Sequence, residues 1–360
     1  MEMKKIMFYI SSMGRGGAER VLSYLAEDLS GQYHITVLTD HAYEQEYALP
    51  KSVRRMNIGD YPGKGLFAPI VRKLWREKKI REAYREVMPD IAVGFMGKNA
   101  VRLLVAARKE KGIKIAAIRM NPVHEFGNGL YKRVVCGLFM RTAWVVCQNE
   151  SQRQYFPKGL QEKTVVIKNP IGEAFCQPRY EGARPQKIVA VGRLDDNKNH
   201  QMLIRAFQKV HARFPSAVLT IYGEGEARSK LESLTGELGL EKCVMLPGIV
   251  EQIPEKIYDA AAYVLCSVSE GISNALLEAM ALGLAVVSTD CEGGSAAELI
   301  RDGENGFLVP VNDVDALSER LMLLLEDPER NRRLGNSAAE VGRQCGRQQI
   351  AKEWERLFNG

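Results

Sequence analysis

The feature that most constrains the fold is a regular alternation between short apolar runs and longer amphipathic segments. The apolar runs lie at residues 6–10, 35–39, 91–95, 115–119, 144–148, 165–167, 188–191, 218–222, 244–246, 263–266, 285–288 and 306–309. Apolar residues recur at helical spacing in the segments 18–29, 200–214, 228–238, 275–281 and 314–325. Short strands that alternate with helices predict parallel sheets covered by helices on both faces, so the expected fold class is α/β.

The alternation is interrupted once, in a segment rich in proline and glycine. Five such residues, Pro170, Gly172, Pro178, Gly182 and Pro185, lie within seventeen positions. We therefore predict a first Rossmann-like domain over residues 1–169, a linker over 170–186 and a second Rossmann-like domain over 187–336. A last helix over 337–360 follows the strands of the second domain and is free to pack back on the first. A length of 360 residues is sufficient for two such domains.

Composition excludes several classes of protein. The opening residues lead into only five apolar positions, and no apolar run is long enough to span a bilayer, so we expect a cytoplasmic protein. The seven cysteines include no C-x-x-C pair, which favours reduced thiols over disulfides or zinc. The five histidines have no ligand spacing. No metal, no cofactor and no nucleic-acid partner are expected.

Positive charge is concentrated in one part of the first half. Between residues 63 and 114 there are fourteen Lys or Arg and five Asp or Glu, within a chain of net charge +6. Many of these cations lie on a predicted helix over residues 66–88. One interpretation is a solvated helix face. The other is a basic amphipathic helix that contacts a phosphate-bearing lipid or the inner face of the cell membrane.

The first predicted strand is followed by a glycine-rich turn. Gly14, Gly16 and Gly17 come directly before a predicted helix, where backbone amides can approach a phosphate. A nicotinamide-binding turn would read G-x-G-x-x-G with an acid closing the second strand. The glycine spacing here differs from that pattern, and Asp40 only just fits it. A simple tight turn explains the loop equally well.

Charged residues follow the strands of the second half. Gly192 and Arg193 end one strand, and Lys198 comes five residues after the arginine, so two cations meet at the carboxyl edge of a parallel sheet. Such a pair could neutralise a diphosphate, although a capped loop with surface charges fits equally well. The next strand ends at Gly223 and Glu224, which alone indicate only a turn.

The most specific stretch covers residues 269–283. It follows an apolar strand, and a helix is predicted to begin at Ser273 or Asn274, both good caps. Glu270 then lies in the loop and Glu278 about one turn inside the helix, with the free amides of the helix start between them. Carboxylates can accept hydrogen bonds from sugar hydroxyls, while the amides can hold a phosphate.

Taken in order, these stretches resemble the retaining glycosyltransferases of family 4. The matching stretches are Gly192-Arg193 with Lys198-Asn199, Gly223-Glu224-Gly225, Glu270-x7-Glu278, and Gly293-Gly294 with Asp302-Gly303 and Asn305-Gly306. The N-terminal Gly16-Gly17-Ala18-Glu19-Arg20 is similar as well. The resemblance covers nearly the whole chain and is most specific over residues 188–310. It implies the GT-B fold, in which two Rossmann-like domains face each other across a cleft.

The resemblance also implies roles for individual residues. Arg193 and Lys198 would bind the donor diphosphate together with Gly192, and Glu270 would contact the transferred sugar. The other expected donor contacts are Gly16, Gly17, Gly223, Glu224, Ile249, Ser273, Asn274, Ala275 and Glu278. In the acceptor half, Arg119, Asn121 and His124 lie where the family often places polar acceptor contacts. After the position of Glu270-Gly271, many members carry an aromatic residue followed by proline or glycine. This chain has Ile272-Ser273 there, and the difference puts its sugar preference in doubt.

The implied reaction is retaining transfer of a hexose or N-acetylhexosamine from a nucleoside-diphosphate sugar, with a UDP-linked donor preferred. The expected acceptor is a glycan or a glycan linked to a polyprenyl diphosphate. Three alternatives stay open: an epimerase or phosphorylase of the same fold, a non-catalytic protein that binds sugar nucleotides, and a nicotinamide-dependent oxidoreductase. The oxidoreductase would leave Glu270 and Glu278 without a role.

Overall fold

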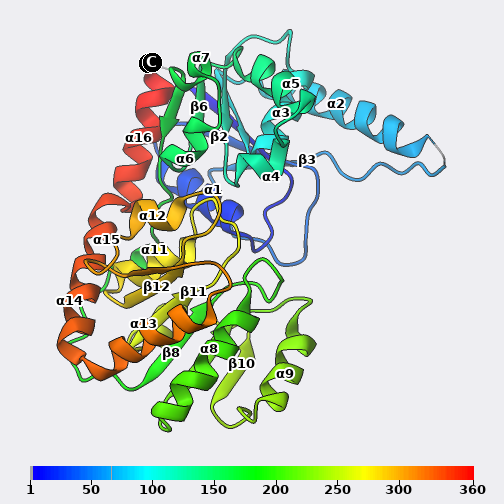
Figure 1. Cartoon of the computed structure of the whole chain (residues 1–360). Coiled ribbons are helices and arrows are strands. Elements are labelled where there is room, and N and C mark those ends of the chain that lie inside the picture. The colour runs from blue at the N-terminus through cyan, green and yellow to red at the C-terminus, as the bar shows by residue number, and fades with distance from the viewer. Residues whose placement is uncertain (1–2, 66) are drawn as a thin grey trace. The chain divides into compact units, whose positions relative to one another are not determined.

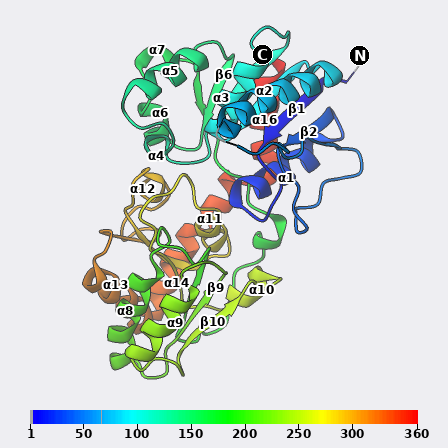
Figure 2. The same ribbon diagram turned by 90° about the vertical axis from the view of Figure 1, so that its right-hand side faces the viewer.

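The computed structural model describes residues 3–65 and 67–360. The chain forms two compact units (Figures 1 and 2). Unit 1 consists of Met1–Pro170 together with Arg347–Gly360, and unit 2 consists of Ile171–Gly346. Each unit is a parallel sheet with helices on both faces, so the predicted α/β class with two parallel sheets is confirmed.

Unit 1 contains a seven-stranded parallel sheet in the order β3-β2-β1-β4-β5-β6-β7. Its strands are β1 (Lys5–Ile10), β2 (His34–Thr39), β3 (Arg54–Asn57), β4 (Ile91–Phe95), β5 (Ile113–Ala117), β6 (Trp144–Cys147) and β7 (Thr164–Val166). In register, Ile6 pairs with Ile35 on one side and with Ile91 on the other. The strand order therefore reverses between β1 and β4, and ligands of such sheets bind at the carboxyl ends of the strands at this switch point.

The helices of unit 1 form two layers. They are α1 (Gly17–Leu29), α2 (Ala68–Val87), α3 (Gly97–Ala106), α4 (Pro122–Phe126), α5 (Leu130–Phe139), α6 (Glu150–Gln154), α7 (Lys158–Gln161) and α16 (Arg347–Asn359). Ile6 and Phe8 pack against α1 and α16 on one face of the sheet. Met7 and Tyr9 point to the other face and pack against α2 and α3. This two-sided burial explains why the strands are apolar almost throughout.

Unit 2 contains a six-stranded parallel sheet in the order β10-β9-β8-β11-β12-β13. Its strands are β8 (Lys187–Val191), β9 (Val218–Tyr222), β10 (Val244–Gly248), β11 (Ala262–Leu265), β12 (Ala285–Thr289) and β13 (Phe307–Val309). Its helices are η1 (Glu173–Phe175), α8 (His200–Arg213), α9 (Arg228–Glu237), α10 (Ile253–Ile257), α11 (Asn274–Ala281), α12 (Ser295–Leu299), α13 (Val314–Glu326), α14 (Pro328–Ala338) and α15 (Glu340–Gln344). Helices α8, α9 and α13 cover one face, and α10, α11 and α15 cover the other.

The segment predicted as a linker, residues 170–186, is packed onto unit 2. Phe175 is buried in its core, and the Arg184 guanidinium donates hydrogen bonds to the carbonyl oxygens of Tyr258 (2.7 Å) and Ala260 (2.9 Å). Proline and glycine therefore mark an irregular but ordered segment here.

The last predicted helix, residues 337–360, is instead divided between the units. Residues 337–346 end α14 and form α15 in unit 2, and α16 belongs to unit 1. The break lies at Gly346, which forms an isolated bridge with Ile171.

Two further predictions need adjustment. Strand β3 was not predicted, because its residues, Arg-Arg-Met-Asn, show neither an apolar run nor a clear alternation. The predicted basic helix began at residue 66, which lies outside the described residues, and the helix itself covers Ala68–Val87. None of the described helices is long and apolar enough to cross a membrane.

Candidate active site

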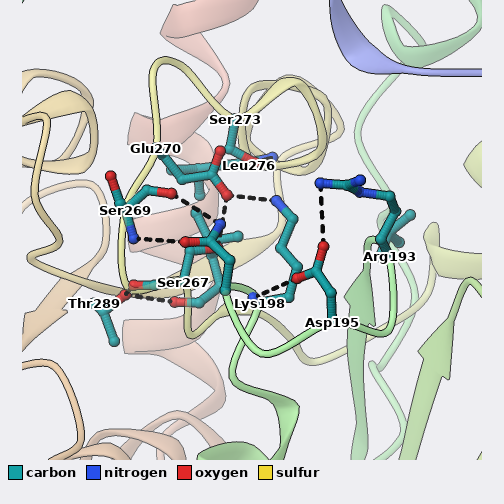
Figure 3. A network of polar contacts seen from close by, with 12 residues as sticks. Arg193, Asp195, Lys198, Ser267, Ser269, Glu270, Ser273, Leu276 and Thr289 are labelled. Atoms are coloured by element: carbon teal, nitrogen blue, oxygen red, sulfur yellow. Dashed lines mark hydrogen bonds and ion pairs between the residues drawn. The ribbon is translucent and has the colours of Figure 1, made fainter. Parts of the chain in front are cut away.

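The candidate residues of unit 2 gather at the carboxyl edge of its sheet. The chain passes from β8 to β9 on one side and returns to β11 on the other, which makes the space above β8 and β11 the switch point. Arg193 and Lys198 follow β8, Gly223 and Glu224 follow β9, and Glu270 follows β11. Figure 3 shows the polar contacts between the loops that follow β8 and β11.

Lys198 and Glu270 form an ion pair at the centre of this edge (Figure 3). The Lys198 Nζ and Glu270 Oε1 atoms are 2.5 Å apart, and the two side chains are only 16% and 14% exposed. The Ser267 hydroxyl donates a second hydrogen bond to the same carboxylate oxygen, at 2.7 Å. Because water is largely excluded, this pair interacts more strongly than a surface pair does.

Backbone and amide hydrogen bonds hold the two loops together. The Asn197 side chain donates to the carbonyl oxygen of Ser269 (3.0 Å) and accepts from the Ser269 amide (3.2 Å). The Val268 amide donates to the carbonyl oxygen of Asn197 at 2.8 Å. The loop that carries Lys198 and the loop that carries Glu270 are therefore fixed relative to each other before any ligand arrives.

Arg193 lies at the outer rim of the same edge. Its side chain is 81% exposed, and its Nη2 atom lies 3.1 Å from Asp195 Oδ2. The other oxygen of Asp195 accepts a hydrogen bond from the Lys198 amide at 2.9 Å. Asp195 therefore contacts the Arg193 guanidinium and the Lys198 backbone, and the exposed guanidinium can turn toward an anion at little cost.

Two glycines allow the β8 and β9 loops to approach each other closely. Gly223 has a φ of +141°, and a Cβ atom at this position would lie 1.8 Å from the carbonyl oxygen of Gly192. A Cβ atom on Gly192 would lie 3.3 Å from the aliphatic stem of Lys198. Position 223 is therefore restricted to glycine, whereas a side chain at position 192 would require the Lys198 stem to shift by a few tenths of an ångström.

Helix α11 begins beside the ion pair. Ser273 is its N-cap, with the hydroxyl accepting a hydrogen bond from the Leu276 amide at 3.4 Å, and Asn274 and Ala275 form its first turn. Glu278 is the fifth residue of this helix, and it is buried. Burial, followed by the charges of Glu278 and Glu270, raises the pKa of Tyr263 well above its ordinary value. Tyr263 therefore remains a neutral phenol beneath the two carboxylates.

His200, the first residue of α8, was not predicted as part of the site. Its Nε2 atom lies 3.2 Å from the carbonyl oxygen of Arg193, so the ring contacts the backbone of the loop that carries Arg193 and Lys198. Burial, and secondarily the charge of Lys198, lowers the pKa of His200 to about 4. The ring is therefore neutral at physiological pH, and Nε2 can donate to the carbonyl. In the sequence it looks like any polar residue at a helix start.

The remaining predicted donor residues of unit 2 lie at the rim. Glu224, in the loop before α9, pairs with Arg228, the first residue of that helix, at 2.5 Å, and hydrogen bonding to Arg228 lowers the pKa of Glu224. Ile249 is exposed just after β10. No group of three or more His, Cys, Asp or Glu side chains within the described part of the chain is placed to hold a metal ion.

The glycine turn predicted from the first half lies at the switch point of unit 1. Gly16 is the N-cap of α1 and Gly17 its first residue. The Gly16 amide donates to the carbonyl oxygen of Gly14 at 2.9 Å, which closes the turn. Asp40, at the end of β2, is buried and accepts a hydrogen bond from the Tyr9 hydroxyl at 2.7 Å.

The three candidate acceptor residues differ in their surroundings. The Arg119 side chain is not on an open surface: it lies over the Phe95 ring (4.6 Å) and the Trp354 ring (5.4 Å) and donates to Asn169 (3.1 Å). Burial lowers the pKa of Arg119 to about 9. Arg119 is therefore buried in unit 1 and packs against Trp354 of α16. Asn121 caps α4 and His124 is exposed on that helix.

Comparison with known proteins assigns the second half of the chain. Residues 178–341 match the family model of the glycosyl transferases group 1. Two relatives from Campylobacter jejuni are each 26% identical to the chain. One is named GalNAc-alpha-(1->4)-GalNAc-alpha-(1->3)-diNAcBac-PP-undecaprenol alpha-1,4-N-acetyl-D-galactosaminyltransferase and is matched over 99% of this chain and 98% of its own. The other is named N-acetylgalactosamine-N,N'-diacetylbacillosaminyl-diphospho-undecaprenol 4-alpha-N-acetylgalactosaminyltransferase and is matched over 98% of both chains.

Solved structures support the fold. The structure of Anabaena HepE with UDP and glucose superimposes with a TM-score of 0.82 at 19% identity and covers 99% of this chain and 100% of its own. Sucrose-phosphate synthase from Thermosynechococcus elongatus gives a TM-score of 0.84 at 16% identity, with coverage of 99% and 98%. Residues 178–341 are thus a glycosyl transferases group 1 domain, and the chain that carries it has the GT-B fold.

Proposed function

We propose that the protein is a retaining glycosyltransferase of family 4 that transfers a hexose or N-acetylhexosamine from a nucleoside-diphosphate sugar, UDP-linked by preference. The observation that carries the proposal is the ion pair of Lys198 and Glu270 at the switch point of unit 2, beside the start of α11 and the exposed Arg193. Cations next to a helix start bind phosphate, and a carboxylate next to them can bind a sugar hydroxyl.

Each residue then has a role in binding the donor. Arg193 and Lys198 bind the diphosphate, and the amides of residues 273–275 extend the same anion site. Glu270, released from Lys198 as phosphate replaces it, accepts a hydrogen bond from the sugar. The ribose lies near Glu278, and the base lies near Gly223, Glu224 and Ile249. These roles follow the family pattern at matching positions.

The proposed reaction exchanges one bond at the anomeric carbon for another on the same face of the sugar. The bond from this carbon to the diphosphate oxygen breaks, and the acceptor oxygen forms the new bond. The acceptor proton passes to the departing phosphate. Negative charge grows on the diphosphate as it leaves, and Lys198, Arg193 and the α11 amides are positioned to stabilise it. In this scheme the neutralising charge is supplied by the chain itself, without a metal or other cofactor.

We propose a glycan linked to a polyprenyl diphosphate as the acceptor. Two relatives that match nearly the whole chain are named for undecaprenol-diphosphate-linked substrates, which supports this assignment. An acceptor of this kind is anchored in a membrane. The basic helix α2 in unit 1 supplies cations suited to the inner face of a membrane, which would make the cytoplasmic protein a peripheral membrane protein.

Product analysis tests the reaction type. The protein is incubated with UDP- and GDP-sugars and a polyprenyl-diphosphate-linked glycan, and the product is examined by NMR at the new anomeric centre. A product with the same anomeric configuration as the donor is expected. An inverted configuration would contradict retention but not transfer, and a freed sugar or epimerised nucleotide without transfer would contradict the proposed function.

A further inference from the structure

The exposed apolar side chains of this protein are unevenly distributed. Half of the large apolar side chains that are exposed in the described part of the chain lie in two short segments of unit 1, residues 61–76 and 127–141. They are Phe67, Ile70, Val71, Leu74, Leu130, Tyr131, Val134 and Met140. Contiguous exposed apolar residues mark an interaction site more often than scattered ones do.

The same two segments carry positive charge and no negative charge. They contain seven cations and neither Asp nor Glu, whereas the whole chain has a net charge of only +6. The rest of the chain therefore has a net charge of −1. Five of the seven cations are exposed: Lys64, Arg72, Lys73, Arg133 and Arg141. Exposed apolar residues interleaved with cations fit an anionic lipid surface, where apolar side chains enter the bilayer and cations meet the headgroups.

The two segments belong to one layer of helices. Helix α2 packs through Ile80 and Tyr84 on the sheet face that bears Met7, next to Leu103 of α3. Helix α5 packs through Val135 and other residues on strands β5 and β6, next to Ala100 of α3. Figure 2 shows α3 between α2 and α5. The two helices that carry the apolar segments therefore pack on either side of α3.

The first turns of α2 and α5, which carry Ile70, Leu74, Leu130 and Val134, lie toward the same edge of the sheet. Helices that connect parallel strands run opposite to the strands, so the first residues of α2 and α5 lie toward the carboxyl edge. Arg76 marks the level of this edge in α2, because its Nε atom lies 3.2 Å from Asp40, which directly follows β2. Residues 68–75 thus extend about 12 Å further, at 1.5 Å per residue. Figure 1 shows this end of α2 standing away from the layer.

The buried Asp40 carboxylate fixes the base of this projection. Besides Arg76 it contacts Arg102 of α3, at 3.3 Å, and the Tyr9 hydroxyl. The projecting turns are held at a defined place although Ile70 and Leu74 are 62% and 60% exposed. These projecting turns of α2 are suited to insertion into a lipid bilayer, because their position is fixed before binding and less conformational entropy is lost.

From these observations we propose that unit 1 docks on an anionic bilayer through two elements, the projecting turns of α2 and the outer face of α5. Leu130, which is 77% exposed, and Val134 form that outer face one helical turn apart, beside Arg133. The docking face lies beside the carboxyl edge of the sheet, where the glycine turn and His124 are found. The inference rests on the proposed function for its use, since it would hold the acceptor half next to a lipid-linked substrate.

Vesicle flotation of the full-length protein tests the proposal without donor or acceptor. Vesicles of phosphatidylcholine alone are compared with vesicles rich in phosphatidylglycerol. The test variants are I70S/L74S in α2 and L130S/V134S in α5. The matched control, M88N/M245S, removes two exposed apolar side chains elsewhere, one of them at the far end of α2. Nucleotide release from a sugar nucleotide is measured in parallel to test the donor site separately.

We expect the wild type and the control to bind the anionic vesicles, and to bind them more weakly at high salt than at low salt. Each test variant should bind these vesicles at least tenfold more weakly than the wild type, because its apolar anchors have been removed. Nucleotide release with a water-soluble acceptor should stay unchanged in the test variants. An α5 variant that binds like the wild type would overturn the two-element face. The proposal would also be overturned if the wild type bound both kinds of vesicle equally. The same holds if it self-associated through these residues and did not bind vesicles. Failure of nucleotide release in every protein would instead count against the proposed function.

Discussion

At the scale of single residues, the candidate site depends on groups that compensate one another. Lys198 and Glu270 are paired at 2.5 Å, and Asp195 contacts both Arg193 and the Lys198 backbone. A partly buried charge without a partner is unfavourable, so each member of the pair offsets the cost of burying the other. An incoming diphosphate can replace Glu270 as the partner of Lys198 and free the carboxylate for the sugar.

The neutral His200 beneath this loop predicts a pH dependence of stability. Its pKa is lowered from 6.5 to about 4, so the unfolded chain binds more protons than the native state between these two values. The free energy of unfolding should therefore fall as pH decreases from 6.5 toward 4, by up to about 3 kcal/mol, and stay unaffected by this group above 6.5. Urea unfolding at a series of pH values measures it.

Two glutamine variants isolate this contribution. His200→Gln keeps a side-chain amide that can donate to the Arg193 carbonyl but cannot be protonated, so its stability should depend less on pH than that of the wild type. His211→Gln is the matched control on the same helix, where the ring contacts the carbonyl oxygen of Ala217, and it should retain the wild-type dependence. Equal pH dependence in wild type and His200→Gln would contradict the assignment.

At the scale of elements, the close approach of the β8 and β9 loops makes a steric prediction. Gly223→Ala places a Cβ atom 1.8 Å from the Gly192 carbonyl oxygen at a φ of +141°. The loops must separate, and we expect a loss of about 1–3 kcal/mol in the free energy of unfolding together with weaker binding of the sugar nucleotide. Calorimetric titration with UDP-sugar measures the second effect.

A helical glycine supplies the control for this experiment. Gly236 lies within α9, and an added Cβ atom there would meet only Glu241, at 3.6 Å. Gly236→Ala should therefore be neutral or stabilising and should leave binding unchanged. If Gly223→Ala binds the donor as well as Gly236→Ala does, the two loops do not shape the site.

Much of the fold could be predicted because its strands are buried on both faces and read as apolar runs. The polar strand β3 lacks this signal. The placement of Arg193, Lys198 and Glu270 in loops after β8 and β11 could also be predicted, since these residues come within seven positions of the end of such runs. The contact between Lys198 and Glu270 could not, because it depends on β8 and β11 being neighbours in the sheet. The burial of Arg119 depends on α16, which lies far away in the sequence.

At the scale of the whole molecule, the last segment of the chain completes the first unit. Trp354 on α16 is fully buried in the core of unit 1 and covers Arg119. Trp354→Ala should therefore lower the free energy of unfolding of unit 1 by about 3–5 kcal/mol and leave unit 2 nearly unchanged. Limited proteolysis with mapping of the cleavage sites distinguishes the units. Lys352→Ala, an exposed position on the same helix, should behave like the wild type. Cleavage that increases equally in both units would contradict this division.

The central claim is that the carboxyl edge of the unit 2 sheet binds and activates a sugar nucleotide. Release of nucleoside diphosphate from a panel of sugar nucleotides, with a lipid-linked acceptor present, tests it most directly. The wild type should release UDP, and Lys198→Ala should be slower by a factor of about 10²–10³, the usual loss when one group that stabilises developing charge is removed. Lys230→Ala, which removes an exposed cation paired only with Asp196 among the described ion pairs, should match the wild type. Full activity in Lys198→Ala would contradict the account.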